Sequence, residues 1–171
     1  MKHNAIALIG MMGSGKSTVA LQLAKKLNFN LFELDEIFED ENKIKIKDYF
    51  EQFGEESFRK KESEILSKAL QIDYSILSCG GGIILKKENR DKLFSENVIT
   101  VYLSTSPQEL FERLKKDTTR PLLQVDNPQE EIKKILTSRE EYYNLADIII
   151  ETDNKTQEEI TEEIIKKIWT E

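Results

Sequence analysis

The residues best suited to chemistry lie near the start of the chain, in the segment Gly10-Met-Met-Gly-Ser-Gly-Lys-Ser-Thr18. The segment fits the pattern G-x-x-x-x-G-K-[ST], in which glycines let backbone N–H groups turn toward an anion at the start of a helix. Lys16 can bridge the β- and γ-phosphates of a nucleotide, and the Ser17 hydroxyl can coordinate Mg²⁺. A glycine turn that only caps a helix would not require lysine and serine at these offsets. The segment therefore predicts a nucleoside triphosphate site.

Arginine is the second chemical signal, because the chain contains 20 lysines and only five arginines. Lysine is sufficient for solubility, so such a composition should keep arginine mainly where a planar, bidentate and permanently charged group is needed. Chance placement is the alternative for any single one. The five candidates are Arg59, Arg90, Arg113, Arg120 and Arg139.

The elements that must position these residues follow from the apolar pattern. Five short runs are continuously apolar, as in strands buried on both faces of a parallel sheet: Asn4–Ile9, Asn30–Leu34, Tyr74–Cys79, Val98–Leu103 and Ala146–Glu151. Helical patterns lie between them at Lys16–Leu27, Glu55–Leu70, Ser106–Lys115, Glu130–Asn144 and Gln157–Trp169. This alternation predicts an α/β domain in which helices flank a central parallel sheet of five strands. Two prolines interrupt the periodicity over Thr118–Pro128, where we expect a mobile loop.

Composition limits the class of protein. The 171 residues match one ordinary domain, so we expect a single domain over residues 1–171. A formal net charge of −7 disfavours nucleic acid as a partner, and no apolar run approaches the ~20 residues of a membrane span. One cysteine excludes an intramolecular disulfide framework, and one histidine excludes a multi-histidine metal site. The start of the chain leads directly into the first predicted strand, so we expect a cytoplasmic protein. We also expect the protein to be a monomer.

A phosphate loop alone leaves GTPases, ATPase motors, nucleotide kinases and small-molecule kinases open. The chain has no N/T-K-x-D motif for reading guanine and is too short for a motor, which leaves a compact phosphotransferase. Further motifs follow in order: Phe32-Glu-Leu-Asp35, Gly54-Glu-Glu-Ser-Phe-Arg-Lys-Lys-Glu62, Gly80–Gly82, Arg113, Thr119-Arg-Pro-Leu-Leu123 and Arg139-Glu-Glu-Tyr-Tyr143. Almost from end to end, this series resembles the shikimate kinase family. The resemblance implies the three-layer P-loop kinase fold, with an acceptor-binding helical segment at about 35–70 and a lid at about 113–128.

The resemblance also implies a role for each motif. The expected catalytic residues are Lys16, Asp35 and Arg120, of which Asp35 orients the acceptor hydroxyl and accepts its proton. The expected ATP-binding residues are Gly13, Ser14, Gly15, Lys16, Ser17, Thr18, Arg113 and Arg120. The expected shikimate-binding residues are Asp35, Arg59, Gly80, Gly81, Gly82 and Arg139. Four of the five arginines thus fall on family positions, and Arg90 is interpreted as a solvated surface charge.

The sequence departs from the family at Glu33, where the first aspartate of an Asp-x-Asp pair is expected. The extra methylene moves the charge by more than about 1 Å, which matters because Mg²⁺ requires near-ideal octahedral geometry. Ser17 is the expected direct ligand of Mg²⁺, and Glu33 is assigned to the metal through a water. The alternative is that the acceptor site has diverged.

The expected reaction is transfer of the γ-phosphate of ATP to the 3-hydroxyl of shikimate, with Mg²⁺ as cofactor and ADP as the second product. A gluconate-type sugar-acid kinase would share the loop and a carboxylate-bearing acceptor, although Gly80–Gly82 and the Phe58-Arg-x-x-Glu62 helix argue against it. A nucleotide-binding regulatory module without phosphotransfer is the alternative from a different class, and Glu33 lends it some support.

Overall fold

Five parallel strands form one sheet in the computed structural model, which describes residues 5–115 and 125–170. The strands are β1 (Ala5–Ile9), β2 (Asn30–Glu33), β3 (Ser75–Ser78), β4 (Val98–Ser104) and β5 (Ile148–Glu151), in the spatial order β2-β3-β1-β4-β5. In the register of the sheet, Ala7 of β1 lies opposite Leu77 of β3 and Thr100 of β4. The predicted α/β architecture with a five-stranded parallel sheet is confirmed.

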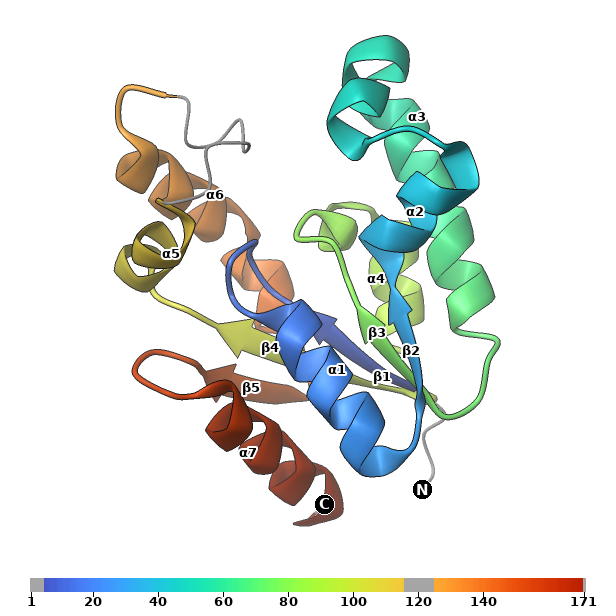
Figure 1. Cartoon of the computed structure of the whole chain (residues 1–171), viewed down its shortest axis with the longest axis vertical. Helices are drawn as coiled ribbons and strands as arrows, with labels where there is room; N and C mark the ends of the chain where they lie inside the picture. Colours follow the sequence, from blue (N-terminus) through green and yellow to red (C-terminus); the bar gives the residue numbers. More distant parts are fainter. Residues whose placement is uncertain (1–4, 116–124, 171) are drawn as a thin grey trace.

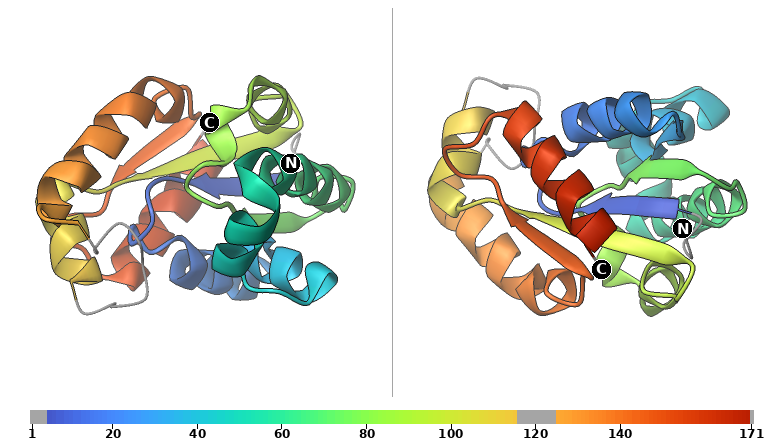
Figure 2. Two further views of the ribbon diagram at one scale, coloured as in Figure 1. Left: turned by 90° about the horizontal axis from the view of Figure 1, so that it is seen from above. Right: turned by 90° about the horizontal axis from the view of Figure 1, so that it is seen from below.

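Helices cover both faces of the sheet and complete the three layers (Figure 1; Figure 2). They are α1 (Lys16–Leu27), α2 (Leu34–Asn42), α3 (Ile46–Ala69), α4 (Lys87–Leu93), α5 (Pro107–Leu114), α6 (Pro128–Tyr143) and α7 (Gln157–Thr170), with a 3₁₀ turn, η1, at Ile83–Leu85. On one face, Leu23 of α1 and Ile164 of α7 pack with Ile6 and Leu8 of β1. Ala7, whose side chain alternates with those of Ile6 and Leu8, lies in the cluster on the other face. Burial of both faces explains why the three central strands, β1, β3 and β4, read as continuously apolar.

The connections at the carboxyl ends of three neighbouring strands carry the predicted site residues. The phosphate loop follows β1, Asp35 follows β2, and Gly80–Gly82 follow β3. Because the three strands are parallel and adjacent, these connections emerge at one edge of the sheet. In Figure 1 the loop before α1 lies between α2 and α3 on one side and α5 and α6 on the other.

The helix α3 starts nine residues before the predicted start at Glu55 and contains a break at Gly54, where φ is +75°. An aromatic contact holds its first part against α2, since Phe38 lies 4.9 Å from Tyr49 between ring centroids. Within α3, Phe50 lies 4.5 Å from Phe58 and joins the two parts of the helix across the break. A Cβ at residue 54 would meet nothing within 4 Å, so glycine is favoured there by its backbone conformation and not by space.

Two helices were missed, and the end of one predicted loop was wrong. The helices α2 and α4 were not predicted as such, because nine and seven residues carry too little periodicity to be distinguished from loops. The loop predicted over Thr118–Pro128 is wrong at its end, because Asn127 caps α6 with its side chain and Pro128 is the first helical residue. Residues 116–124, including Arg120, lie outside the described residues. Within the described part of the chain, no helix is long and apolar enough to cross a membrane.

Candidate active site

The phosphate loop turns through conformations that only glycine adopts easily. Gly13 and Gly15 have φ values of +82° and +94°. Space is restricted as well, because a Cβ on Gly13 would lie 2.8 Å from Cγ of Leu114 and one on Gly15 would lie 2.9 Å from Nε2 of Gln157. The helix α1 begins immediately at residue 16, so its first backbone N–H groups are available to an anion held by the loop. The loop has the backbone geometry of an anion cradle.

Lys16 is held inside this loop by two carbonyl groups. Its Nζ donates hydrogen bonds to the carbonyl oxygens of Gly10 at 2.9 Å and Met11 at 2.8 Å. The residue is only 9% exposed, and a buried ammonium group requires such partners. A positive charge is therefore already fixed at the place where the loop would receive a phosphate.

A cluster of oxygen atoms lies beside the loop, where α1 begins and the strands β2 and β3 end. The Ser17 hydroxyl donates a hydrogen bond of 3.0 Å to Oε2 of Glu33 and lies 3.4 Å from the hydroxyl of Ser78. Hydroxyl and carboxylate oxygens are ligands that Mg²⁺ accepts. No group of three or more His, Cys, Asp or Glu side chains forms a metal site among the described residues. The oxygen cluster fits a Mg²⁺ ion that takes few protein ligands and completes its shell with phosphates and water.

One cavity of about 430 Å³ joins the phosphate loop to the ends of β2 and β3. The predicted site residues in its wall are Gly13, Gly15, Lys16, Ser17, Thr18, Glu33, Asp35, Gly80, Gly81 and Arg113. Ser14 of the loop is fully buried, and its hydroxyl has no hydrogen-bond partner among the described residues. The cavity thus joins the phosphate loop to residues expected to bind the acceptor, whereas Gly82, Arg59 and Arg139 are not among the described residues that line it.

Each glycine of Gly80–Gly82 makes room for a different group, and none of the three has a positive φ. A Cβ on Gly80 would lie 2.9 Å from Oδ1 of Asp35 and 3.2 Å from Oε1 of Glu62. One on Gly81 would lie 3.4 Å from the carbonyl oxygen of Gly10, and one on Gly82 would overlap the guanidinium of Arg59. Close approach of side chains therefore favours glycine at residues 80 and 82, whereas a Cβ on Gly81 would make an ordinary contact.

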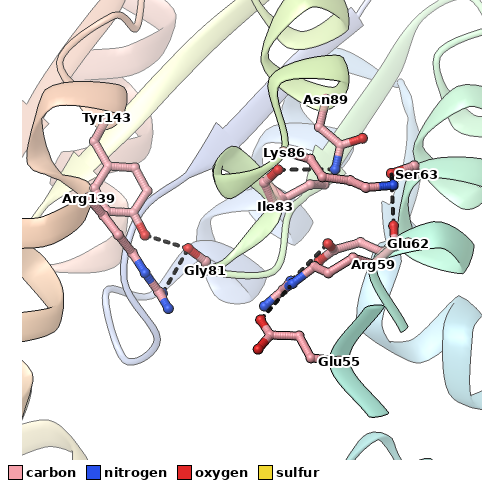
Figure 3. A network of polar contacts seen from close by, with 10 residues as sticks. All are labelled: Glu55, Arg59, Glu62, Ser63, Gly81, Ile83, Lys86, Asn89, Arg139 and Tyr143. Carbon is pink, nitrogen blue, oxygen red and sulfur yellow. Dashed lines mark hydrogen bonds and ion pairs between the residues drawn. The ribbon is translucent and has the colours of Figure 1, made fainter. Parts of the chain in front are cut away.

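Arg59 and Glu62 form a largely buried ion pair on α3 (Figure 3). Nη1 of Arg59 donates to both carboxylate oxygens of Glu62, at 3.0 and 2.8 Å, and Nε donates to Oε1 of Glu55 at 3.3 Å. The guanidinium also lies 5.0 Å from the ring centroid of Phe58. Burial raises the pKa of the Glu62 carboxyl, although the charge and hydrogen bonds of Arg59 act in the opposite direction. The pair fixes the guanidinium while part of its donor edge remains available.

Arg139 reaches the same glycine segment from α6, on the opposite side (Figure 3). Its Nη1 donates to the carbonyl oxygen of Gly81 at 3.1 Å, and the hydroxyl of Tyr143 donates to the same oxygen at 2.6 Å. Tyr143 is fully buried and stacks on Tyr102, with 4.9 Å between ring centroids. Burial raises the pKa of Tyr143 to about 12. Tyr143 thus fixes the carbonyl group that orients Arg139.

Arg113 links the phosphate loop to the end of β5. Its Nη1 donates to the carbonyl oxygen of Ser14 at 3.4 Å and its Nη2 to that of Thr152 at 3.1 Å, while Glu109 accepts from Nε at 2.9 Å. The side chain therefore lies in the wall of the cavity, next to the phosphate loop.

Sequence reasoning was wrong about Arg90 and missed two contributors to the site. Arg90 is not a solvated charge, because Nη1 donates to the carbonyl oxygens of Ile84 and Leu85 and the guanidinium lies 4.1 Å from the ring centroid of Tyr142. Ser78 was missed because a serine inside an apolar strand carries no signal of its own. The four-residue spacing of Arg139 and Tyr143 on a predicted helix could have identified Tyr143.

Comparison with known proteins gives one consistent family. The sequence model of the family described as "Shikimate kinase" matches residues 12–169. A shikimate kinase of Thermodesulfovibrio yellowstonii is 42% identical over 162 residues, which are 95% of this chain and 93% of that protein. A shikimate kinase of Legionella pneumophila is 38% identical over 172 residues, which cover 100% and 98% of the two chains.

Solved structures agree with the sequence comparison. The shikimate kinase of Acinetobacter baumannii in complex with shikimate superposes with a TM-score of 0.92 at 32% identity, covering 98% of this chain and 94% of that chain. A gluconokinase of Sinorhizobium meliloti, at 18% identity and a TM-score of 0.64, covers 99% and 93% of the two chains and shares the fold alone.

Proposed function

The chain belongs to the shikimate kinase family, and we propose that it transfers the γ-phosphate of ATP to the 3-hydroxyl of shikimate. The products are shikimate 3-phosphate and ADP. The observation that carries this proposal is the convergence of Arg59 and Arg139, from two different helices, on the glycine segment beside the phosphate loop. Two permanently charged forks at one site match an acceptor with a carboxylate group.

Asp35 is the proposed group that orients the acceptor hydroxyl and takes its proton. It lies in the wall of the cavity together with Lys16, and its Oδ1 occupies the space into which a side chain on Gly80 would project. Phosphoryl transfer leaves little covalent chemistry to a protein, so positioning the hydroxyl and neutralising charge should supply most of the rate. Lys16 supplies a charge that is already fixed in the loop before the nucleotide arrives.

Mg²⁺ is the proposed cofactor, with Ser17 as a direct ligand and Glu33 acting through a water. The contact of 3.0 Å between the Ser17 hydroxyl and the Glu33 carboxylate supports this assignment, because both oxygens face the same small volume. When bound, the ion would neutralise charge on the phosphate oxygens. Glu33, one methylene longer than aspartate, reaches that volume without displacing Ser17.

The nucleotide side of the proposal comprises the phosphate loop residues Gly13–Thr18, Arg113 and Arg120. The contacts of Arg113 with the loop and with the end of β5 support its place. Arg120 is proposed from the sequence motif alone. We further propose that the chain is one domain over residues 1–171 and acts as a cytoplasmic monomer.

The test is a coupled assay of ADP release with shikimate, with gluconate and without acceptor. Shikimate-dependent release that yields a stoichiometric phosphate ester supports the proposal. ADP release with gluconate but not with shikimate would indicate a sugar-acid kinase. Nucleotide binding without ADP release under any condition would indicate a regulatory module. A parallel titration with EDTA and added Mg²⁺ tests the cofactor.

A further inference from the structure

Lys86 lies behind the acceptor-side ion pair and belongs to no motif that the proposed function uses. It precedes α4, and its Nζ donates a hydrogen bond of 3.4 Å to the hydroxyl of Ser63 on α3. The Ser63 hydroxyl in turn donates a hydrogen bond of 2.8 Å to the backbone carbonyl of Arg59. Figure 3 shows this chain of contacts next to the Arg59–Glu62 pair. Among the described residues, Lys86 forms no ion pair within 4.0 Å, although it is half-buried.

We propose that Lys86 is a positioning residue for Arg59, acting on it through the Ser63 hydroxyl and through the charge of Glu62. The proposal rests on the proposed function, because it assigns Arg59 to the carboxylate of the acceptor. Lys86 touches neither substrate in this assignment.

The electrostatic part of this role follows from the surroundings of Glu62. The Glu62 side chain is 5% exposed and faces the positive charges of Arg59 and Lys86, while Asp35 on α2 supplies an opposing negative charge. The pKa of the Glu62 carboxyl is raised by burial and by Asp35 and is lowered by Arg59 and Lys86. Cys79 at the end of β3 is buried and uncharged. Lys86 therefore helps Glu62 to stay ionised, and only the ionised carboxylate can hold the guanidinium with two charge-assisted hydrogen bonds.

The chain contains a matched pair of residues that separates this role from simple packing of α4 on α3. Lys92 also donates to a serine hydroxyl of α3, at 2.8 Å to Ser67, and Ser67 donates to the carbonyl oxygen of Ser63. The Lys92–Ser67 contact repeats the Lys86–Ser63 contact one helical turn further along α3 and does not involve Arg59 or Glu62. Replacing Lys92 should thus reproduce any general loosening of the two helices.

The experiment compares wild type, Lys86→Met, Lys86→Arg and Lys92→Met by steady-state kinetics between pH 5.5 and 8. Methionine keeps the length of the side chain and leaves the backbone that caps α4 unchanged. We expect Lys86→Met to raise the KM for shikimate about fivefold at pH 7, and more at pH 6, with the KM for ATP and kcat within twofold of wild type. Lys86→Arg and Lys92→Met should both keep the wild-type KM for shikimate. An unchanged shikimate KM in Lys86→Met, or an equal rise in Lys92→Met, overturns the proposal.

A second measurement needs no substrate and therefore does not depend on the proposed function. The carboxyl carbon of Glu62 can be titrated by ¹³C NMR in the free protein, with Glu62→Gln to assign its signal. Lys86→Met should raise the pKa of Glu62 relative to wild type, and Lys92→Met should leave it unchanged. If the wild-type protein did not phosphorylate shikimate, the proposed function would be refuted. This titration would still decide whether Lys86 acts on Glu62. Equal titration curves in wild type and Lys86→Met would overturn the electrostatic role.

Discussion

The guanidinium of Arg59 occupies the space that a side chain on Gly82 would need, since a Cβ there would lie 2.7 Å from Cζ of Arg59. The absence of a side chain at residue 82 is thus as much a part of the proposed acceptor site as the arginine itself. Substitution Gly82→Ala should displace the guanidinium without touching the phosphate loop. We expect the KM for shikimate to rise at least tenfold and the affinity for ATP to stay within twofold. Calorimetric titrations with each substrate check this, and parallel losses of both affinities would contradict it.

Arg59→Lys tests the fork geometry directly. Lysine keeps the charge but cannot donate to Glu62, Glu55 and an acceptor carboxylate in one plane. We expect shikimate binding to weaken by about 1.5–3 kcal/mol, the range for hydrogen bonds to charged groups. Arg90→Lys is the matched control, because Arg90 is also half-buried but its guanidinium contacts Tyr142 of α6 and the backbone carbonyl oxygens of Ile84 and Leu85. Equal effects of the two substitutions on shikimate affinity would count against the assignment of Arg59.

Lys16→Met should abolish turnover, because the loop would lose the charge that meets the transferred phosphoryl group. The structure adds an effect on stability, since the carbonyl oxygens of Gly10 and Met11 would lose their donor. We expect the free energy of unfolding to fall by about 1–2 kcal/mol, the cost of unsatisfied buried acceptors. Urea denaturation and turnover should be measured on the same preparation. Activity within tenfold of wild type would refute the role of Lys16.

Glu33 is tested by its two closest replacements. Glu33→Gln removes the charge beside the Ser17 hydroxyl and should raise the concentration of Mg²⁺ needed for half-maximal ADP release. Glu33→Asp keeps the charge and should leave activity equal or higher. Three superimposable Mg²⁺ titrations, for wild type and both variants, would remove Glu33 from the metal site while leaving the kinase assignment intact.

Tyr143 gives a prediction at alkaline pH. Its pKa is raised by burial from 10.0 to about 12, so the unfolded chain loses this proton at a lower pH than the folded one. The folded state then binds more protons, and the free energy of unfolding should decrease as the pH rises from 10 toward 12. Tyr143→Phe should reduce this decrease, at a cost of about 1 kcal/mol at neutral pH for the hydrogen bond to Gly81. Denaturation at a series of pH values measures how the free energy of unfolding changes with pH in wild type and in Tyr143→Phe. The decrease above pH 10 should be steeper in wild type.

Local sequence was sufficient to determine the phosphate loop, its helix and the architecture of the sheet. The pattern of glycine, lysine and serine needs only the strand before it and the helix after it, and the predicted helix Lys16–Leu27 agrees with α1 at both ends. The central strands β1, β3 and β4 were recognisable because burial on both faces leaves a continuous apolar run. The motif series also gave the family, because its members are spread along the whole chain.

The tertiary structure alone determined which groups these motifs bring into contact. In the sequence Gly80–Gly82 are one motif of the series, and only the fold places Asp35, the phosphate loop and Arg59 near one glycine each. Arg90 belongs to no motif in the sequence, yet its guanidinium packs on Tyr142, while that of Arg139 donates to the carbonyl oxygen of Gly81. Such contacts join elements from distant parts of the chain, and the packing of helices on a parallel sheet sets their geometry. Local sequence fixes the conformation of a segment, whereas its partners depend on how all the layers pack together.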